Sequence, residues 1–144
     1  MTMMRALFAC MAMAGLTAIA WGQAPAPPPA ALPVGNAADG QTVFRKCLAC
    51  HQIGPGAKNS IGPSLNGVVG RTAGTYPGYA YSDANRNSGV VWTEAALAQY
   101  LPSPKDFIPG TKMTFAGLPM PQEVANVIAY LRQFDADGNK AATK

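Results

Sequence analysis

The sequence predicts an all-α domain in which three helices are joined by loops rich in glycine and proline. Three stretches of the chain place apolar residues at the spacing of an amphipathic helix. Nowhere do polar and apolar residues alternate as they would along a half-buried strand, and no internal repeat is visible. The 15 glycines and 13 prolines of the chain indicate irregular connections between the helices.

The first helix is expected from Ala37 to Leu48. Asn36 or Asp39 can cap its N-terminus, and apolar residues, among them Val43 and Phe44, recur at helical spacing. The second and third helices follow much later in the chain.

The second helix is expected from Thr93 to Leu101, because Thr93 is a good cap and Pro102 disfavours a longer helix. The third is expected from Pro121 to about Phe134, since proline is favoured at the first helical position. Four residues form its apolar face: Val124, Val127, Ile128 and Leu131.

Residues 1–22 have the pattern of a cleaved signal peptide. Arg5 precedes an uncharged apolar run from Ala6 to Trp21, and small residues follow in a pattern suited to cleavage. An uncleaved anchor is the alternative, although the run is somewhat shorter than the roughly 20 apolar residues of a membrane span. We therefore expect export to the periplasm, with a membrane-tethered form as the alternative.

Residues 23–35 are rich in proline and alanine, which favours an extended and solvated linker. The folded domain is expected over residues 36–136, and residues 137–144 form a polar tail. A domain of about a hundred residues has a small core, which a large covalent cofactor would enlarge.

The charge of the chain does not indicate a nucleic-acid-binding protein. The net charge is +4, and removal of residues 1–22 leaves ten basic and seven acidic residues. These are spread along the chain without a basic run or an aromatic-interleaved basic patch.

The segment CLACH, Cys47 to His51, admits three explanations. A structural zinc site wants four ligands, but His51 is the only histidine and Cys10 lies in the signal peptide. A thioredoxin-like dithiol needs its first thiol at a helix N-terminus, whereas Cys47 comes at the end of the first helix. Attachment of a c-type haem uses every position, with two thioether bonds and an adjacent histidine for the iron.

Met113 is the candidate for the second axial ligand of that iron. Five of the seven methionines lie in residues 1–22, which leaves Met113 and Met120. Met113 lies in a Pro/Gly loop without helical periodicity, whereas Met120 stands between two prolines at a helix start. His/Met ligation is typical of cytochromes c.

The chain resembles the class I cytochromes c, a family that includes mitochondrial cytochrome c and its bacterial relatives. The resemblance runs from about Gly40 to Phe134 and rests on motifs in the family's order: CLACH, GPSLNGVVGR, PGYAYSDANRNSGVVW, FIPGTKMTFAG and VIAYLRQF. It implies the class I fold, with the first and last helices crossing at Gly40, Phe44 and Tyr130. It also implies one covalently bound haem c with its iron.

The resemblance assigns roles to further residues around the haem. Pro63 would accept a hydrogen bond from His51. Three residues would hold a buried haem propionate: Arg71, Tyr81 and Trp92. Four more would surround the methionine and the haem edge: Asn85, Tyr100, Thr111 and Phe115. The alternatives are core packing for the aromatic side chains and a solvated turn for Arg71.

In the family, a ring of lysines around the haem edge forms the docking face. Four of these positions keep a lysine in this chain, namely Lys46, Lys58, Lys105 and Lys112. At a fifth position Asp106 replaces a basic residue. Ordinary solubility is the alternative role of these lysines.

The expected function is that of an electron carrier, not an enzyme, monomeric and without a small-molecule substrate. The family's precedent implies a quinol-oxidising cytochrome bc complex as donor and an oxidase or photosynthetic reaction centre as acceptor. Two alternatives remain open, namely a dedicated electron-entry subunit of one oxidoreductase, and a haem enzyme or sensor with a labile methionine ligand.

Overall fold

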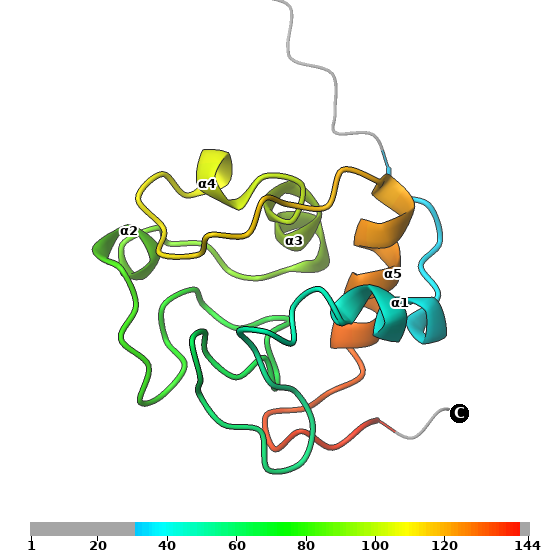
Figure 1. Cartoon of the computed structure of the whole chain (residues 1–144), viewed down its shortest axis with the longest axis horizontal. Helices are drawn as coiled ribbons and strands as arrows, with labels where there is room; N and C mark the ends of the chain where they lie inside the picture. Colours follow the sequence, from blue (N-terminus) through cyan, green and yellow to red (C-terminus); the bar gives the residue numbers. More distant parts are fainter. Residues whose placement is uncertain (1–30, 142–144) are drawn as a thin grey trace, which may run out of the picture.

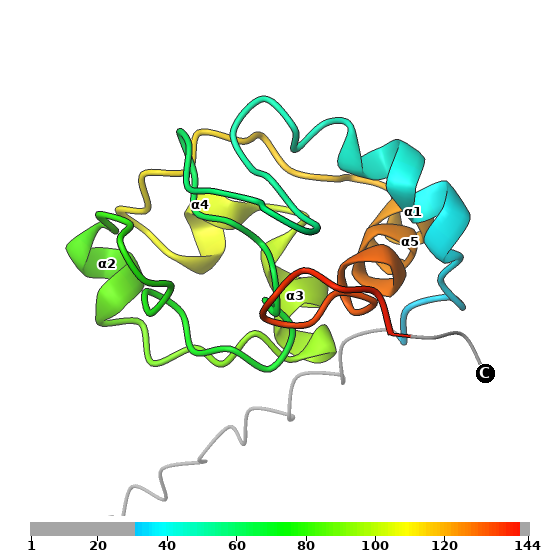
Figure 2. The same ribbon diagram turned by 90° about the horizontal axis from the view of Figure 1, so that it is seen from below.

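The computed structural model describes residues 31–141, and two crossing helices organise this part of the chain. Helix α1 (Ala37–Phe44) crosses α5 (Pro121–Leu131) at Gly40, which approaches so closely that a Cβ atom there would overlap the Asn126 carbonyl. Beside this contact the rings of Phe44 and Tyr130 lie 5.3 Å apart. The predicted crossing is therefore confirmed, and Figures 1 and 2 show the two helices side by side at one end of the molecule.

Helix α1 begins as predicted, but the expected extension to Leu48 is wrong. The Asn36 side chain caps it by accepting hydrogen bonds from the Ala38 and Asp39 amides, at 2.8 and 3.2 Å. After Phe44 the backbone hydrogen bonds join residues three positions apart instead of four, and the chain continues as tight turns to Cys50. Side chains three apart lie in line in such turns, which matters for the two thiols.

Helix α5 starts at Pro121 as predicted but ends at Leu131, three residues before the expected Phe134. The chain turns there because Phe134 pairs with Lys140 in an isolated antiparallel bridge. All residues from Val124 to Leu131 are buried, so α5 is the central helix of the core.

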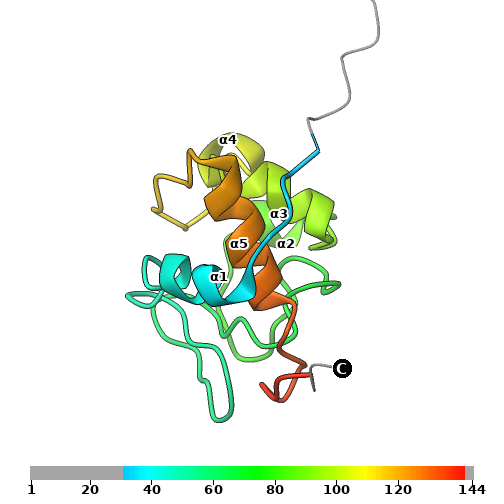
Figure 3. The same ribbon diagram turned by 90° about the vertical axis from the view of Figure 1, so that its right-hand side faces the viewer.

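Helix α3 (Glu94–Tyr100) agrees with the prediction, with Thr93 as the cap that accepts from the Ala96 amide at 3.1 Å. It packs on α5, and Figure 3 shows α5 between α1 and α3. Two single-turn helices were not predicted, α2 (Asp83–Arg86) and α4 (Pro104–Phe107). Each of them follows a serine, a residue that favours the start of a helix, and this was the sequence signal that could have predicted them.

Both ends of the described chain pack on the domain. Residues 31–35, expected as a solvated linker, lie against α5: Leu32 contacts the core, and the Gln122 side chain donates to the Val34 carbonyl at 2.9 Å. The expected polar tail also folds back onto the domain up to residue 141. The predicted signal peptide, the linker up to residue 30 and residues 142–144 lie outside the described residues.

Between the helices the chain is irregular, and only two isolated β-bridges occur within residues 31–141. Much of this irregular chain lies to the left of α1 and α5 in the view of Figure 1. Across residues 31–141, none of the helices combines the length and apolar character needed to cross a membrane.

Candidate functional site

A cavity of about 300 Å³ brings together all of the predicted site residues. It lies between α3, α5 and the loops, and its lining includes the two thiols, both predicted iron ligands and the aromatic and polar side chains named from the resemblance. These residues are Cys47, Cys50, His51, Pro63, Arg71, Tyr81, Asn85, Trp92, Tyr100, Thr111, Met113 and Phe115. Segments up to 68 positions apart in the sequence thus contribute to one site.

The two thiols lie in the tight turns that follow α1. The Cys50 amide donates to the Cys47 carbonyl at 3.0 Å, and the His51 amide donates to the same carbonyl at 2.9 Å. Both thiols are free and half-buried. Burial, and to a smaller extent the neighbouring Cys50, together raise the pKa of the Cys47 thiol to about 11 against the lowering effect of Lys46. Two thiols three positions apart in such a turn, both lining one cavity, suit attachment to one edge of a flat group.

The His51 imidazole is held in one orientation by the Pro63 carbonyl, 2.7 Å from Nδ1. A carbonyl only accepts, so Nδ1 carries the proton and Nε2 keeps a free electron pair. Burial lowers the pKa of His51, against the hydrogen bond to Pro63, and the Arg71 charge lowers it further. His51 is therefore a neutral, oriented imidazole, the form that binds a metal.

Met113 is held by α3 and by its own loop. The Tyr100 hydroxyl donates to the Met113 sulfur at 2.9 Å, and the Met113 amide donates to Thr111 Oγ1 at 3.3 Å. Burial raises the pKa of Tyr100 to about 12, with an opposing contribution from its hydrogen bond to Thr111. The phenol therefore keeps its proton and orients the thioether at neutral pH.

Arg71 reaches the cavity from the loop after Val68. Its guanidinium donates to the Asn66 carbonyl at 2.7 Å and to the Ser64 carbonyl at 3.3 Å, and it lies 4.7 Å from the ring centre of Tyr76. Burial raises the pKa of Tyr81, and the Arg71 charge opposes that rise. The alternative of a freely solvated Arg71 is not what the structure shows.

Two observations test whether the site fits a haem c. Asn85 Oδ1 is buried without a hydrogen-bond partner among the described residues, and a bound group or an ordered water would supply one. Gly62 lies so close to the imidazole that a Cβ atom there would come within 2.3 Å of His51 Cε1 and 2.6 Å of Nδ1, so any side chain at this position would displace the ring. Together with the two thiols and the neutral imidazole, these features fit a covalently attached haem.

The other two explanations of CLACH do not fit the structure. Within residues 31–141 no group of three or more His, Cys, Asp or Glu side chains could hold a metal ion, so the zinc site finds no further ligands. The first thiol lies beyond the C-terminal end of α1 rather than at a helix N-terminus, so the dithiol site lacks its activating dipole.

The family model of cytochrome c matches residues 37–135 of this chain. The chain belongs to the cytochrome c family. It is an electron-transfer haem protein of this family rather than an enzyme, and its cofactor is a covalently bound haem c with iron, attached at the C-x-x-C-H motif. Its partners are other redox proteins.

Three relatives show how far the similarity extends. Cytochrome c2 of Blastochloris viridis is 58% identical over 105 residues, which are 73% of this chain and 83% of the relative. Cytochrome c-550 of Bradyrhizobium diazoefficiens is 57% identical over 102 residues, 71% of this chain and 75% of the relative. The structure of cytochrome c2 from Rhodospirillum centenum matches with a TM-score of 0.68 at 43% identity, covering 70% of this chain and 99% of the other.

Some residues that line this cytochrome c site were not predicted from the sequence. Gly62 and the apolar residues Leu65 and Val68 line the cavity, and only their place in GPSLNGVVG hinted at this. Tyr79, to which the sequence assigned no role at the haem, also lines the cavity and donates to the Ile61 carbonyl at 2.7 Å.

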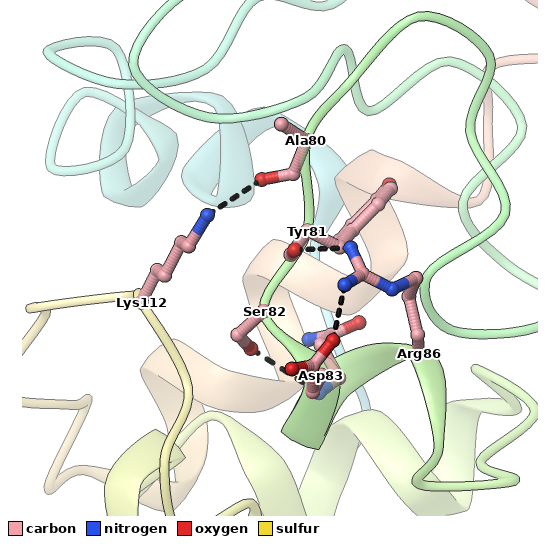
Figure 4. Close-up of polar contacts among 7 residues, drawn as sticks. Ala80, Tyr81, Ser82, Asp83, Arg86 and Lys112 are labelled. Atoms are coloured by element: carbon pink, nitrogen blue, oxygen red, sulfur yellow. Dashed lines mark hydrogen bonds and ion pairs between the residues drawn. The ribbon is translucent and has the colours of Figure 1, made fainter.

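Two of the four lysines expected on the docking face, Lys46 and Lys112, also line the cavity. Lys112 donates to the Ala80 carbonyl at 3.1 Å, which joins the Met113 loop to the segment before α2 (Figure 4). From within α2, Arg86 donates to the Tyr81 carbonyl of that segment and to the Asp83 carboxylate, which holds the acceptor side of the contact.

Proposed function

We propose that His51 and Met113 would bind the haem iron, and that the protein carries single electrons between two redox complexes outside the cytoplasm. The observation that carries the proposal is the arrangement of one oriented, neutral imidazole and one hydrogen-bonded thioether in the same cavity as the two thiols. A haem c bound there supplies a one-electron Fe(III)/Fe(II) couple.

The residues of the chain set the properties of that couple. The thioether of Met113 is a weak donor, and its hydrogen bond from Tyr100 weakens it further, which favours the reduced iron. The Pro63 carbonyl makes His51 a better donor by binding its second ring nitrogen. If His51 and Met113 both bind the iron, the protein itself would occupy the sites at which a substrate could bind, which supports a carrier over a haem enzyme or sensor.

We propose that Arg71, Tyr81 and Trp92 hold an acidic side chain of the haem. Arg71 is the cation of this group, and the Trp92 ring packs on Tyr100 with centroids 4.6 Å apart. A carboxylate removed from water needs a cation and hydrogen-bond donors, and these side chains line the cavity together.

We propose a quinol-oxidising cytochrome bc complex as donor and an oxidase or photosynthetic reaction centre as acceptor. The exposed lysines support brief encounters with acidic partner surfaces, because complementary charge speeds association more than it tightens it. The Lys46 ammonium is engaged with Glu123 at 2.7 Å, so Lys58, Lys105 and Lys112 contribute more to this field. Residues 1–22 support export, and mass spectrometry of the mature N-terminus tests cleavage against a retained anchor.

The ligand assignment is tested by absorption spectroscopy of the protein exported with haem-maturation machinery. The oxidised protein should show the weak red band of sulfur bound to Fe(III), and Met113→Ala should lose it. Met120→Ala is the matched control, because Met120 is 58% exposed and should leave the band unchanged. A band that survives in Met113→Ala would reject Met113 as ligand. A partner that copurifies at fixed stoichiometry would favour the dedicated-subunit alternative.

A further inference from the structure

The C-terminal residues 135–141 form a small hairpin that lies against the loop following His51. The Asp135 amide donates to the Asn139 carbonyl at 3.0 Å, and the Ala141 amide donates to the Gln133 carbonyl at 2.8 Å. The Asp135 side chain closes the turn by accepting from the Asp137 and Asn139 amides at 2.9 and 2.8 Å. The hairpin is thus a defined element.

Gly138 is the point at which this hairpin contacts the rest of the molecule. It is the one buried residue among positions 135–141, where its neighbours are exposed. A Cβ atom at Gly138 would overlap the Gly54 carbonyl and come within 2.5 Å of the side-chain nitrogen Nδ2 of Asn66. A second contact joins Gly67 to Ala136, where a Cβ atom on the glycine would lie 3.0 Å from the Ala136 Cα.

Asn66 connects this contact to the haem cavity. Asn66 is buried, with 4% of its surface exposed. Its side chain makes two hydrogen bonds with Gly54: Oδ1 accepts from the Gly54 amide at 2.8 Å, and Nδ2 donates to the Gly54 carbonyl at 3.0 Å. The backbone carbonyl of the same Asn66 accepts from Arg71 at 2.7 Å. The position of the guanidinium therefore depends on a backbone that the hairpin confines.

We propose that the C-terminal hairpin is a positioning element for Arg71, acting through Gly138 and Asn66. This rests on the proposed role of Arg71 in holding an acidic side chain of the haem. A cation fixed beside the haem disfavours the additional positive charge of the oxidised iron, so it raises the reduction potential. If the hairpin is displaced, the Asn66 carbonyl gains freedom, Arg71 moves toward solvent, and the potential falls.

The test compares Gly138→Ala with Gly89→Ala in the full haem-loaded protein. Both glycines have positive φ angles, +84° and +67°, so both substitutions introduce backbone strain. Nothing lies within 4 Å of a Cβ atom at Gly89, whereas one at Gly138 overlaps Gly54. The difference between the two variants therefore isolates the contact of the hairpin.

We expect Gly138→Ala to lower the reduction potential and to speed exchange of the Arg71 guanidinium protons about tenfold, as seen by NMR of the reduced protein. Gly89→Ala should do neither. In an Asn66→Ala background the substitution at Gly138 should have little further effect, since both act on one path. Equal potentials and equal exchange in the two glycine variants would overturn the proposal.

Arg71→Gln separates this inference from the proposed role of Arg71. If Arg71→Gln lowers the potential and Gly138→Ala does not, the positioning by the hairpin is wrong while the role of Arg71 stands. If Arg71→Gln leaves the potential unchanged, the proposed role of Arg71 is wrong, and the inference built on it falls with it.

Discussion

The hydroxyl oxygen of Tyr100 lies 2.9 Å from the sulfur atom of Met113 and donates a hydrogen bond to it. Tyr100→Phe removes the hydroxyl group, and with it this bond and the hydrogen bond to Thr111, while it keeps the ring. We expect the reduction potential to fall by about 20 to 60 mV, which corresponds to the loss of one hydrogen bond of about 0.5–1.5 kcal/mol that favours the reduced state.

The measurement is a spectroscopic redox titration, and Tyr79→Phe is the matched control. Tyr79 lines the same cavity, but its hydroxyl donates to the Ile61 carbonyl rather than to the thioether. Equal shifts in the two variants would mean that loss of a hydroxyl anywhere in the cavity, and not the bond to sulfur, changes the potential.

The raised pKa of Tyr100, about 12, predicts how stability depends on alkaline pH. In the unfolded chain the phenol loses its proton near pH 10, whereas the buried phenol keeps it to about pH 12. The protonated Tyr100 phenol therefore stabilises the folded state fully below pH 10. As the pH rises from 10 to 12, the free energy of unfolding should fall by about 2 to 3 kcal/mol.

Denaturant unfolding of the wild type and of Tyr100→Phe between pH 9 and 12 checks this. The variant should lose less stability over that interval than the wild type. Because burial also raises the pKa of Tyr81 and of Tyr130, both proteins should retain some pH dependence. Parallel curves would show that Tyr100 does not contribute.

The crossing of α1 and α5 predicts that Gly40→Ala destabilises the fold. In an open helix this change would stabilise by about 0.5–1 kcal/mol. At Gly40 the new methyl would overlap the Asn126 carbonyl and approach Tyr130 Cβ, so we expect a net loss of about 1 to 3 kcal/mol. Gln41→Ala, at the next and exposed position of α1, is the control for helix propensity and should change the denaturation midpoint little. A stabilised Gly40→Ala would show that the helices do not meet there.

The hydrogen bond from Lys112 to the Ala80 carbonyl predicts a local effect of Lys112→Gln that charge alone does not produce. Loss of a bond of about 0.5–1.5 kcal/mol should increase opening of the Met113 loop about two- to tenfold, measured by amide hydrogen exchange. Lys105→Gln removes the same charge from an exposed residue of α4 and should leave this exchange unchanged. Both variants should slow association with an acidic redox partner to a similar extent. Faster exchange in both would assign the effect to charge.

The sequence by itself determined the chemistry of the site and the start of each main helix. The spacing of Cys47, Cys50 and His51, the one methionine in a Pro/Gly loop, and the helix-start signals at Asn36 or Asp39, at Thr93 and at Pro121 are local features. They depend only on residues a few positions apart, so they are visible without the fold.

Only the tertiary structure decided where helices end and which loops confine the site. Helix α1 ends at Phe44 because the chain changes to tight turns there, and α5 ends at Leu131 because Phe134 pairs with Lys140. The contact of Gly138 with Gly54 joins residues 84 positions apart, and the Arg71 guanidinium meets backbone carbonyls that carry no side-chain signal. Such contacts depend on backbone atoms, which all residues share, so the sequence does not mark them in advance.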